Sequence, residues 1–257
     1  MDVGQLFSIR DKVALVTGGS RGIGEMIARG YVAAGAKVYI SSRKAEVCDA
    51  LAEELSGQGR CISLPADLGT VEGCERLAAE LAEREPRLHV LVNNAGAAWG
   101  APLGEYSAEG FDKVMNLNVR AVFLLTQALA PQLSAGASAE DPARVINIGS
   151  IDGLGIPELP TFAYSASKAA VHQLSRHLGK AMVADHVTVN AIAPGLFPSE
   201  MTAFMFEHEQ AVLAQIPMHR PGTAEDIAGT AIYLASRAGA YVTGAIIPVD
   251  GGHQTLR

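Results

Sequence analysis

The sequence predicts an α/β fold in which helices cover both faces of a parallel sheet. Short continuous apolar runs recur along the chain, which is typical of strands buried on both faces of such a sheet. Stretches with helical spacing of apolar residues lie between these runs, so strand and helix alternate. The first run, residues 13–17, leads directly into a glycine-rich turn at 18–24 and then into a helical pattern. This strand–turn–helix order is the context that a nucleotide-binding unit requires.

The expected elements follow from these patterns in chain order. The strands are expected at residues 13–17, 37–41, 61–64, 89–92, 144–148, 187–192 and 245–249. The helices are expected at residues 23–32, 44–56, 71–84, 108–133, 163–178 and 223–236. Thr223 with Asp226 three residues later predicts a capped start for the last helix. The long connection 196–222 is rich in Met and Phe, which predicts a lid or binding loop for an apolar ligand. A short amphipathic helix packed on the sheet is the alternative for this segment.

The composition excludes several classes of function. The chain has 257 residues, 49% of them hydrophobic, which suffices for a sizeable core. Its net charge of −7 argues against nucleic acid or an anionic membrane as the main partner. Cys48, Cys61 and Cys74 form neither a disulfide framework nor a metal motif, and the seven histidines show no metal-ligand spacing. With no secretory signal and no apolar run of membrane-spanning length, we expect a cytoplasmic protein without a metal site.

The glycine-rich turn is the candidate phosphate site. Gly18, Gly22 and Gly24 follow the first strand with the spacing Gly-x-x-x-Gly-x-Gly. Glycines allow close approach of a ligand, and the free N–H groups and dipole of the following helix favour an anion. A tight turn that merely requires glycine is the alternative. The flanking strand and helix favour dinucleotide binding.

Two further strand ends bear on the choice of cofactor. At the end of the second strand, an acidic residue would bind a ribose 2′-hydroxyl, whereas arginine accommodates a 2′-phosphate. The chain has Ser42 and Arg43 there, and with Arg21 they would form a cationic cup for a phosphate, which predicts NADP rather than NAD. A solvated charge at a helix start is the alternative. Asp67 follows the third strand and would reach an adenine amino group, cap the next helix, or do both.

The candidate catalytic pair is Tyr164 and Lys168. They are four residues apart in an alanine-rich helical stretch, so both side chains lie on one face of the helix. A neighbouring ammonium group favours the phenolate, so we expect the pKa of Tyr164 to fall below its ordinary value of about 10. Such a tyrosine is suited to acid–base catalysis. The pair alone also arises by chance on surface helices.

Two polar residues extend this pair. Ser150 ends the fifth strand, on the sheet edge where ligands bind, and would hydrogen-bond a substrate oxygen or cap a turn. Asn118 falls in the apolar middle of an expected helix, where it would either satisfy local backbone or hold a bound water. The small residues after Asn93, at 94–96, would let the sheet edge approach a cofactor.

Taken together, these motifs resemble the short-chain dehydrogenase/reductase family over essentially the whole chain. They occur in the family's order: Thr17-Gly18-x-x-x-Gly22-x-Gly24, Asp67, Asn93-Asn94-Ala95-Gly96, Asn118, Ser150, Tyr164-x-x-x-Lys168 and Pro194-Gly195. The resemblance implies a single domain over residues 1–257, a doubly wound Rossmann fold with a seven-stranded parallel sheet, a homotetramer, and NADP or NAD as hydride carrier. It places the substrate segment at about 196–222.

The resemblance also implies the site residues. The implied catalytic tetrad is Asn118, Ser150, Tyr164 and Lys168. The implied cofactor contacts are Gly18, Ser20, Arg21, Gly22, Ile23, Gly24, Ser42, Arg43, Asp67, Leu68, Asn94, Ala95, Gly96, Tyr164, Lys168, Pro194, Gly195, Phe197 and Ser199. Ser199 stands where the family often has threonine near the nicotinamide amide, a departure that keeps the hydroxyl.

Within the family, the chain is similar to 3-oxoacyl-[acyl-carrier-protein] reductases associated with rhamnolipid synthesis. The similarity lies in the loop 134–142 with the strand after it, and in the segment 193–202. It implies NADPH-dependent reduction of a ketone, with a 3-oxoacyl thioester as the expected substrate. A sugar, a steroid or another small ketone is the enzymatic alternative. A cofactor-binding regulatory protein without turnover is the alternative from another class.

Overall fold

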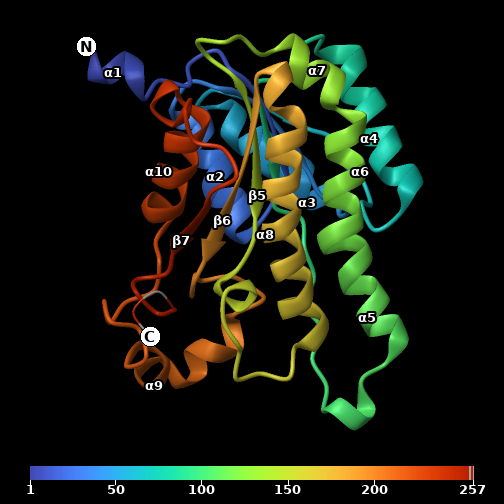
Figure 1. Cartoon of the computed structure of the whole chain (residues 1–257), viewed down its shortest axis with the longest axis vertical. Helices are drawn as coiled ribbons and strands as arrows, with labels where there is room; N and C mark the ends of the chain where they lie inside the picture. The colour runs from blue at the N-terminus through green and yellow to red at the C-terminus, as the bar shows by residue number, and fades with distance from the viewer. Residues whose placement is uncertain (255, 257) are drawn as a thin grey trace.

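A computed structural model describes residues 1–254 and residue 256. Seven strands form one parallel sheet in the order β3-β2-β1-β4-β5-β6-β7, with helices on both faces (Figure 1). The chain moves outward from β1 to β3, and then returns to pair β4 with the other side of β1. Ligands of doubly wound sheets bind at this reversal, outside the carboxyl ends of the strands. The seven-stranded parallel sheet was expected and is confirmed.

The elements have the following bounds. The strands are β1 (Val13–Thr17), β2 (Lys37–Ser41), β3 (Arg60–Ser63), β4 (Val90–Asn93), β5 (Ala143–Ile148), β6 (Val187–Pro194) and β7 (Ile246–Val249). The helices are α1 (Val3–Leu6), α2 (Gly22–Ala33), α3 (Ala45–Ser56), α4 (Val71–Arg84), α5 (Ala108–Met115), α6 (Ala121–Ala128), α7 (Ala130–Ala135), α8 (Phe162–Met182), α9 (Glu209–Leu213) and α10 (Ala224–Ala235). The capped start of α10 is confirmed, because Thr223 and Asp226 form the reciprocal capping box.

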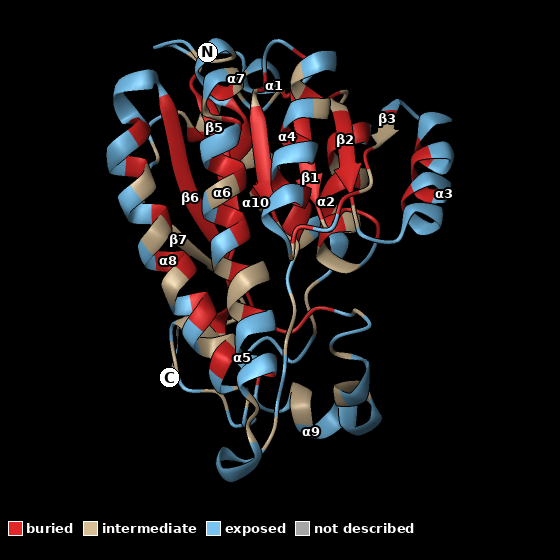
Figure 2. Ribbon diagram, turned by 90° about the vertical axis from the view of Figure 1, so that its right-hand side faces the viewer, coloured by how far each residue is buried: buried red, intermediate tan, exposed pale blue. Residues whose placement is uncertain are grey.

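Two apolar layers pack against the sheet, one on each face. Successive residues of β1 alternate between them, with Val16 in the layer under α2, α3 and α10, and Leu15 in the layer under α4, α6 and α8. Figure 2 shows the buried strands enclosed between these helices. This explains why the strand sequences are apolar throughout instead of alternating. Among the described residues, no helix combines the length and apolar character needed to cross a bilayer.

The expected single helix at 108–133 is wrong in one respect. The chain is helical here, but a π-helical turn at Asn116–Arg120 separates α5 from α6, and α7 begins with Pro131 in its first turn. The extra residue in the π turn accommodates Asn118, whose amide bonds outside its own helix. Single π turns often mark functional sites.

The segment 196–222 extends past the carboxyl ends of the strands. It contains a 3₁₀ stretch at Ala203–His208 followed by the short helix α9, and the rest is irregular. Figure 1 shows α9 below the sheet, at the same end as the loop before α5 and the loop before α8. The segment is a long loop with short helical turns that bury no residue, so the alternative of a helix packed on the sheet is wrong. Its role as a lid or binding loop stays a prediction.

Candidate active site

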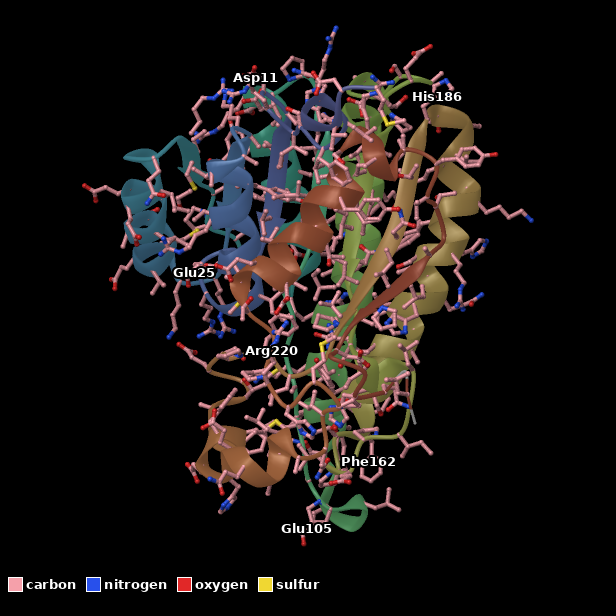
Figure 3. The ribbon with its side chains drawn as sticks, turned by 90° about the vertical axis from the view of Figure 1, so that its left-hand side faces the viewer. Asp11, Glu25, Glu105, Phe162, His186 and Arg220 are labelled. Atoms are coloured by element: carbon pink, nitrogen blue, oxygen red, sulfur yellow. The ribbon has the colours of Figure 1, made fainter. Side chains whose placement is uncertain are left out.

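The sheet order brings the expected site residues to one edge. Strands β1, β4 and β5 are neighbours in the sheet, so the glycine turn after β1, the small residues after β4 and Ser150 after β5 lie side by side. Helix α8 packs on β6 and on the turn after β5, which brings Tyr164 and Lys168 to the same edge. Figure 3 shows this end of the molecule, with Phe162 at the start of α8 and Glu105 at the tip of the loop before α5.

Tyr164 and Lys168 lie on one face of α8, as expected. The Nζ atom of Lys168 is 5.4 Å from the centroid of the Tyr164 ring and donates a hydrogen bond of 2.8 Å to the carbonyl oxygen of Ile148. The expected fall in the pKa of Tyr164 is wrong for this structure: burial raises this pKa to about 12, although a hydrogen bond with Ser150 acts in the opposite direction. Burial also lowers the pKa of Lys168 to about 8. For the Tyr164 phenol, desolvation therefore outweighs the hydrogen bond with Ser150.

Ser150 caps a turn, and the turn surrounds a buried histidine. Its Oγ atom accepts the backbone N–H of Asp152 at 3.1 Å, and the side chain is only 7% exposed. Beneath this turn lies the ring of His172, one helical turn beyond Lys168. A Cβ atom at Gly149 would come within 2.2 Å of its Nε2 atom, and one at Gly153 would lie 2.9 Å from its Cε1 atom. The imidazole thus supports the turn that carries Ser150, and both glycines are needed for this close packing.

Asn118 joins three elements through its amide. Its Oδ1 atom accepts the backbone N–H of Ala97 at 2.8 Å, while its Nδ2 atom donates to the carbonyl of Ala97 at 3.0 Å and to Ser167 Oγ at 2.9 Å. Ser167 precedes Lys168 on α8. The expected satisfaction of local backbone is therefore wrong: the backbone that Asn118 satisfies belongs to a distant loop and not to its own helix. The amide fixes the loop after β4 against α8, beside the catalytic pair.

The glycine turn meets the requirements for a phosphate. Gly18 has a φ of +61°, a left-handed conformation that favours glycine. At Gly24 a Cβ atom would lie 2.2 Å from the carbonyl oxygen of Gly18, so the helix and turn can approach only without a side chain. No side chain caps the N-terminus of α2, so its N–H groups remain available to an anion. These residues fit a dinucleotide phosphate.

A hydrogen-bonded seam holds this turn against the residues after β4. The Oγ1 atom of Thr17 accepts the N–H groups of Asn94 and Ala95 at 3.0 and 3.1 Å. The Asn94 side chain donates to the carbonyls of Thr17 and Gly18 at 2.9 and 3.1 Å. Asn94 therefore ties down backbone, as asparagine in a turn is expected to do. Ser20 is buried within the turn, and Ile23 is half-buried at the start of α2.

Of the residues expected at the adenosine end, Arg21 and Arg43 are exposed and Ser42 is half-buried. The Arg21 guanidinium forms an ion pair with Glu200, which lies in the segment 196–222. Arg43 is exposed without an ion pair among the described residues, and the Ser42 hydroxyl bonds to the carbonyl of Lys44 at 3.2 Å. The structure thus gives Arg21 a partner that the sequence did not indicate, and leaves Arg43 free for a phosphate.

The expected cap role of Asp67 is wrong. Thr70 caps α4 by accepting the N–H of Gly73 at 3.0 Å, whereas the Asp67 carboxylate accepts the N–H of Gly69 at 3.0 Å. Asp67 is exposed beside buried Leu68 at the edge of the sheet, which leaves its expected contact with adenine available.

After β6, the Phe197 side chain does not lie where a cofactor contact was expected. Pro194 and Gly195 lie at the end of β6, next to β7. The Phe197 side chain, 2% exposed, packs in the apolar core, so only its backbone is available to a cofactor. The Ser199 hydroxyl lies 3.0 Å from Thr202 Oγ1, which itself donates to the carbonyl of Phe197 at 2.6 Å. A cavity of about 320 Å³ is lined by residues of 196–222 and 248–252 and by Asp226, and no tetrad residue borders it.

Several residues that shape the site were not expected from the sequence. Thr17 belonged to the glycine motif, but nothing in the pattern indicated that its hydroxyl accepts two N–H groups. Ser167 and His172 lie in the helical stretch of Tyr164, and no motif in that stretch singled them out. Asp152 follows Ser150 by two residues, and burial raises the pKa of its carboxyl. Its position so close to Ser150 is the one signal that would have pointed to it.

Comparisons with known proteins agree with this geometry. A family model described as enoyl-(acyl carrier protein) reductase matches residues 18–254. A rhamnolipids biosynthesis 3-oxoacyl-[acyl-carrier-protein] reductase from Pseudomonas aeruginosa is 53% identical over 96% of this chain and 97% of its own length. A short-chain dehydrogenase/reductase from Diaporthe leptostromiformis, PhomF, is 35% identical over 96% of this chain and 92% of its own.

A solved structure of the Pseudomonas aeruginosa RhlG/NADP active-site complex superposes with a TM-score of 0.95 at 52% identity, covering 97% of this chain and 99% of that one. The motif order, the sheet and these relatives lead to one assignment. The chain belongs to the short-chain dehydrogenase/reductase family.

Proposed function

We propose that this protein is an NADPH-dependent reductase that converts the ketone of a 3-oxoacyl thioester to a secondary alcohol, reversibly. One observation carries the proposal: Tyr164, Lys168 and Ser150 meet at the sheet edge that also bears the uncapped N-terminus of α2. A proton donor thus lies at the same edge as a phosphate site, which is the arrangement that hydride transfer to a carbonyl requires.

The residues of the chain supply orientation and a proton. When bound, NADPH supplies the hydride. Ser150 donates a hydrogen bond to the carbonyl oxygen of the substrate and orients it. Tyr164 donates its phenolic proton to this oxygen as negative charge develops there. Lys168 stabilises the phenolate that remains, and its pKa of about 8 leaves it largely cationic at neutral pH. Asn118 holds the loop after β4 against α8 through its amide, which keeps the residues around Lys168 in place.

The proposed cofactor is held by the elements around β1. The N-terminus of α2 and the glycine turn would bind the pyrophosphate, and Arg43 with Ser42 would bind the 2′-phosphate. Asp67 would bind the adenine, and Lys168 would also bind the nicotinamide ribose. The NADP complex of the RhlG structure supports this choice over NAD.

The substrate class is supported by a relative and by the surface near Tyr164. The relative from Pseudomonas aeruginosa is named for 3-oxoacyl reduction. Large apolar side chains such as Ile156 and Phe204 are exposed on the loops around the site, which suits an acyl chain better than a sugar. A steroid or another small ketone is the enzymatic alternative. A silent cofactor-binding protein is disfavoured because Tyr164 and Lys168 are both present.

An NADPH-consumption screen tests the proposal. The wild-type protein is assayed with 3-oxoacyl thioesters of several chain lengths, simple ketones, sugars and steroids. We expect the thioesters to give the highest kcat/KM. A higher kcat/KM for a sugar or a steroid would reject the proposed substrate and keep the reductase. No turnover with any carbonyl, despite tight NADPH binding, would favour the regulatory alternative.

We further propose a cytoplasmic homotetramer in which residues 1–257 form a single domain. The exposed aromatic residue Phe123 supports an interface on α6. The three cysteines, all buried and free, support a reducing compartment. Light scattering of the purified protein measures the oligomeric state, and a monomer would contradict the tetramer.

A further inference from the structure

The loops beyond the carboxyl ends of β4, β5, β6 and β7 form what we call the distal lobe, defined as residues 97–113, 150–163, 196–222 and 250–254. Figure 1 shows its loops and α9 grouped below the sheet, around the start of α8. Tyr164 lies in the first turn of α8, so a substrate that approaches it from beyond the strand ends passes these loops.

The distal lobe is both apolar and acidic. Ten of the exposed large apolar side chains lie on it: Trp99, Leu103, Phe111, Leu154, Ile156, Leu159, Phe162, Met201, Phe204 and Met218. It also carries nine carboxylates: Glu105, Glu109, Asp112, Asp152, Glu158, Glu200, Glu207, Glu209 and Asp250. Only Lys113 and Arg220 oppose them among its lysines and arginines. Outside the lobe the chain carries eighteen residues of each sign, so the whole net charge of −7 resides in the lobe.

The two cations of the lobe are already engaged. The Nζ atom of Lys113 lies 5.9 Å from the centroid of the Trp99 ring, and Arg220 pairs with Asp226 at 2.6 Å. Among the carboxylates, Glu200 pairs with Arg21. Glu105, Glu158 and Glu207 are exposed and form no ion pair among the described residues. The approach to Tyr164 is therefore an apolar surface under a negative potential.

Such a surface distinguishes between carriers of the same acyl chain. Like charges across an interface slow association and cost affinity, whereas exposed apolar area favours apolar ligands of any charge state. Resting on the function proposed above, we propose that the natural substrate presents its 3-oxoacyl chain on a group without net negative charge, such as a neutral thioester or ester. Acyl groups on a nucleotide phosphate carrier or on an acidic carrier protein are repelled. This departs from the carrier named for the relative from Pseudomonas aeruginosa.

The experiment compares one 3-oxoacyl chain on three carriers: N-acetylcysteamine, coenzyme A and acyl carrier protein. Values of kcat/KM are measured with NADPH at two ionic strengths, about 0.01 M and about 0.15 M, between which the Debye length falls from about 30 Å to about 8 Å. We expect the neutral thioester to exceed both anionic ones by at least about 10-fold at low salt. Higher salt should raise kcat/KM for the anionic thioesters only.

A charge-removal variant and a matched control test whether the carboxylates of the distal lobe lower kcat/KM for the anionic thioesters. The triple variant Glu105→Gln, Glu158→Gln, Glu207→Gln should raise kcat/KM for both anionic thioesters several-fold and leave the neutral one unchanged. The control Glu83→Gln, Glu140→Gln, Asp185→Asn removes three exposed charges at the opposite edge of the sheet and should change none of them.

The outcomes separate this inference from the proposed function. An anionic thioester that is preferred, with a rate that falls as salt increases, overturns the inference and leaves the proposed function intact. A triple variant that behaves like the control also overturns it. If none of the three thioesters is reduced, the proposed substrate fails and the inference fails with it.

Discussion

The Nζ atom of Lys168 lies 5.4 Å from the centroid of the Tyr164 ring, on the same face of α8, where Lys168 is buried and Tyr164 is half-buried. Burial raises the pKa of the phenol to about 12 and lowers that of the amine to about 8. The pair is therefore built to keep Tyr164 protonated as an acid and to make the charge of Lys168 sensitive to pH in the mildly alkaline range.

The first prediction concerns pH. Reduction needs Tyr164 as a neutral acid and Lys168 as a cation, and the second condition is lost above pH 8, where the amine gives up its proton. We expect kcat for ketone reduction to be level below this value and to fall about tenfold per pH unit above it. Lys168→Arg should move the fall to higher pH, because the guanidinium stays charged. A level profile up to about pH 10 in the wild type would contradict the role of Lys168.

The second prediction concerns cofactor choice. Arg43 is exposed and without an ion pair among the described residues, so its charge is available to the 2′-phosphate. Arg43→Ala should weaken NADPH binding by about tenfold or more and leave NADH binding nearly unchanged. The control is Arg84→Ala, on α4, whose guanidinium pairs with Glu80. Titration calorimetry with both cofactors measures the effect, and equal losses for NADPH and NADH would reject the assignment.

The third prediction concerns the glycine turn. Gly24→Ala places a methyl group 2.2 Å from the carbonyl oxygen of Gly18, so the turn or the helix must move. We expect a loss of about 1–3 kcal/mol in the free energy of unfolding and a marked loss of NADPH affinity. Gly229 on α10 is the control, because a methyl group there meets nothing within 4 Å. Gly229→Ala should stabilise the protein by about 0.5–1 kcal/mol. Denaturant unfolding of both variants decides the matter.

The fourth prediction concerns His172. Burial lowers the pKa of its ring to about 4 from an ordinary 6.5, so the folded state keeps it neutral while the unfolded chain binds a proton first. The contribution of His172 to stability is complete above pH 6.5 and falls by about 3 kcal/mol as the pH drops to 4. His172→Gln should lose this part of the pH dependence. Unfolding curves at several pH values measure it, and equal slopes for both proteins would refute the prediction.

The sequence predicted the strands well and the polar contacts less well. A buried parallel strand is an uninterrupted apolar run, so β1 and β2 were expected with their observed bounds. The glycine turn and the pair Tyr164 and Lys168 were recognisable because their chemistry depends on residue types at local spacings, whereas the full tetrad was implied only by the resemblance to the family. The π turn was not, because it depends on the bonds of Asn118 to Ala97 and Ser167, which the fold alone brings together.

The pKa of Tyr164 also depends on both a local sequence feature and the packed structure. Its neighbour Lys168 was visible in the sequence, but the degree of burial is a property of the packed structure, and burial determined the direction of the shift. The sequence could not identify the N-cap of α4, because Asp67 and Thr70 are both good capping residues. The backbone conformation places Thr70 at the N-cap. The ion pair between Arg21 and Glu200 joins residues from the first and sixth strand ends, which no local pattern can indicate.

The most direct test of the whole account is Tyr164→Phe, measured for NADPH binding and for turnover in the same preparation. Phenylalanine removes the proton donor and keeps the ring that packs beside Lys168. We expect unchanged folding, NADPH affinity within about twofold of the wild type, and a kcat for ketone reduction lower by about 10²–10⁴-fold. A variant that binds NADPH and reduces the same substrate as fast as the wild type would contradict the assignment of Tyr164 as the acid.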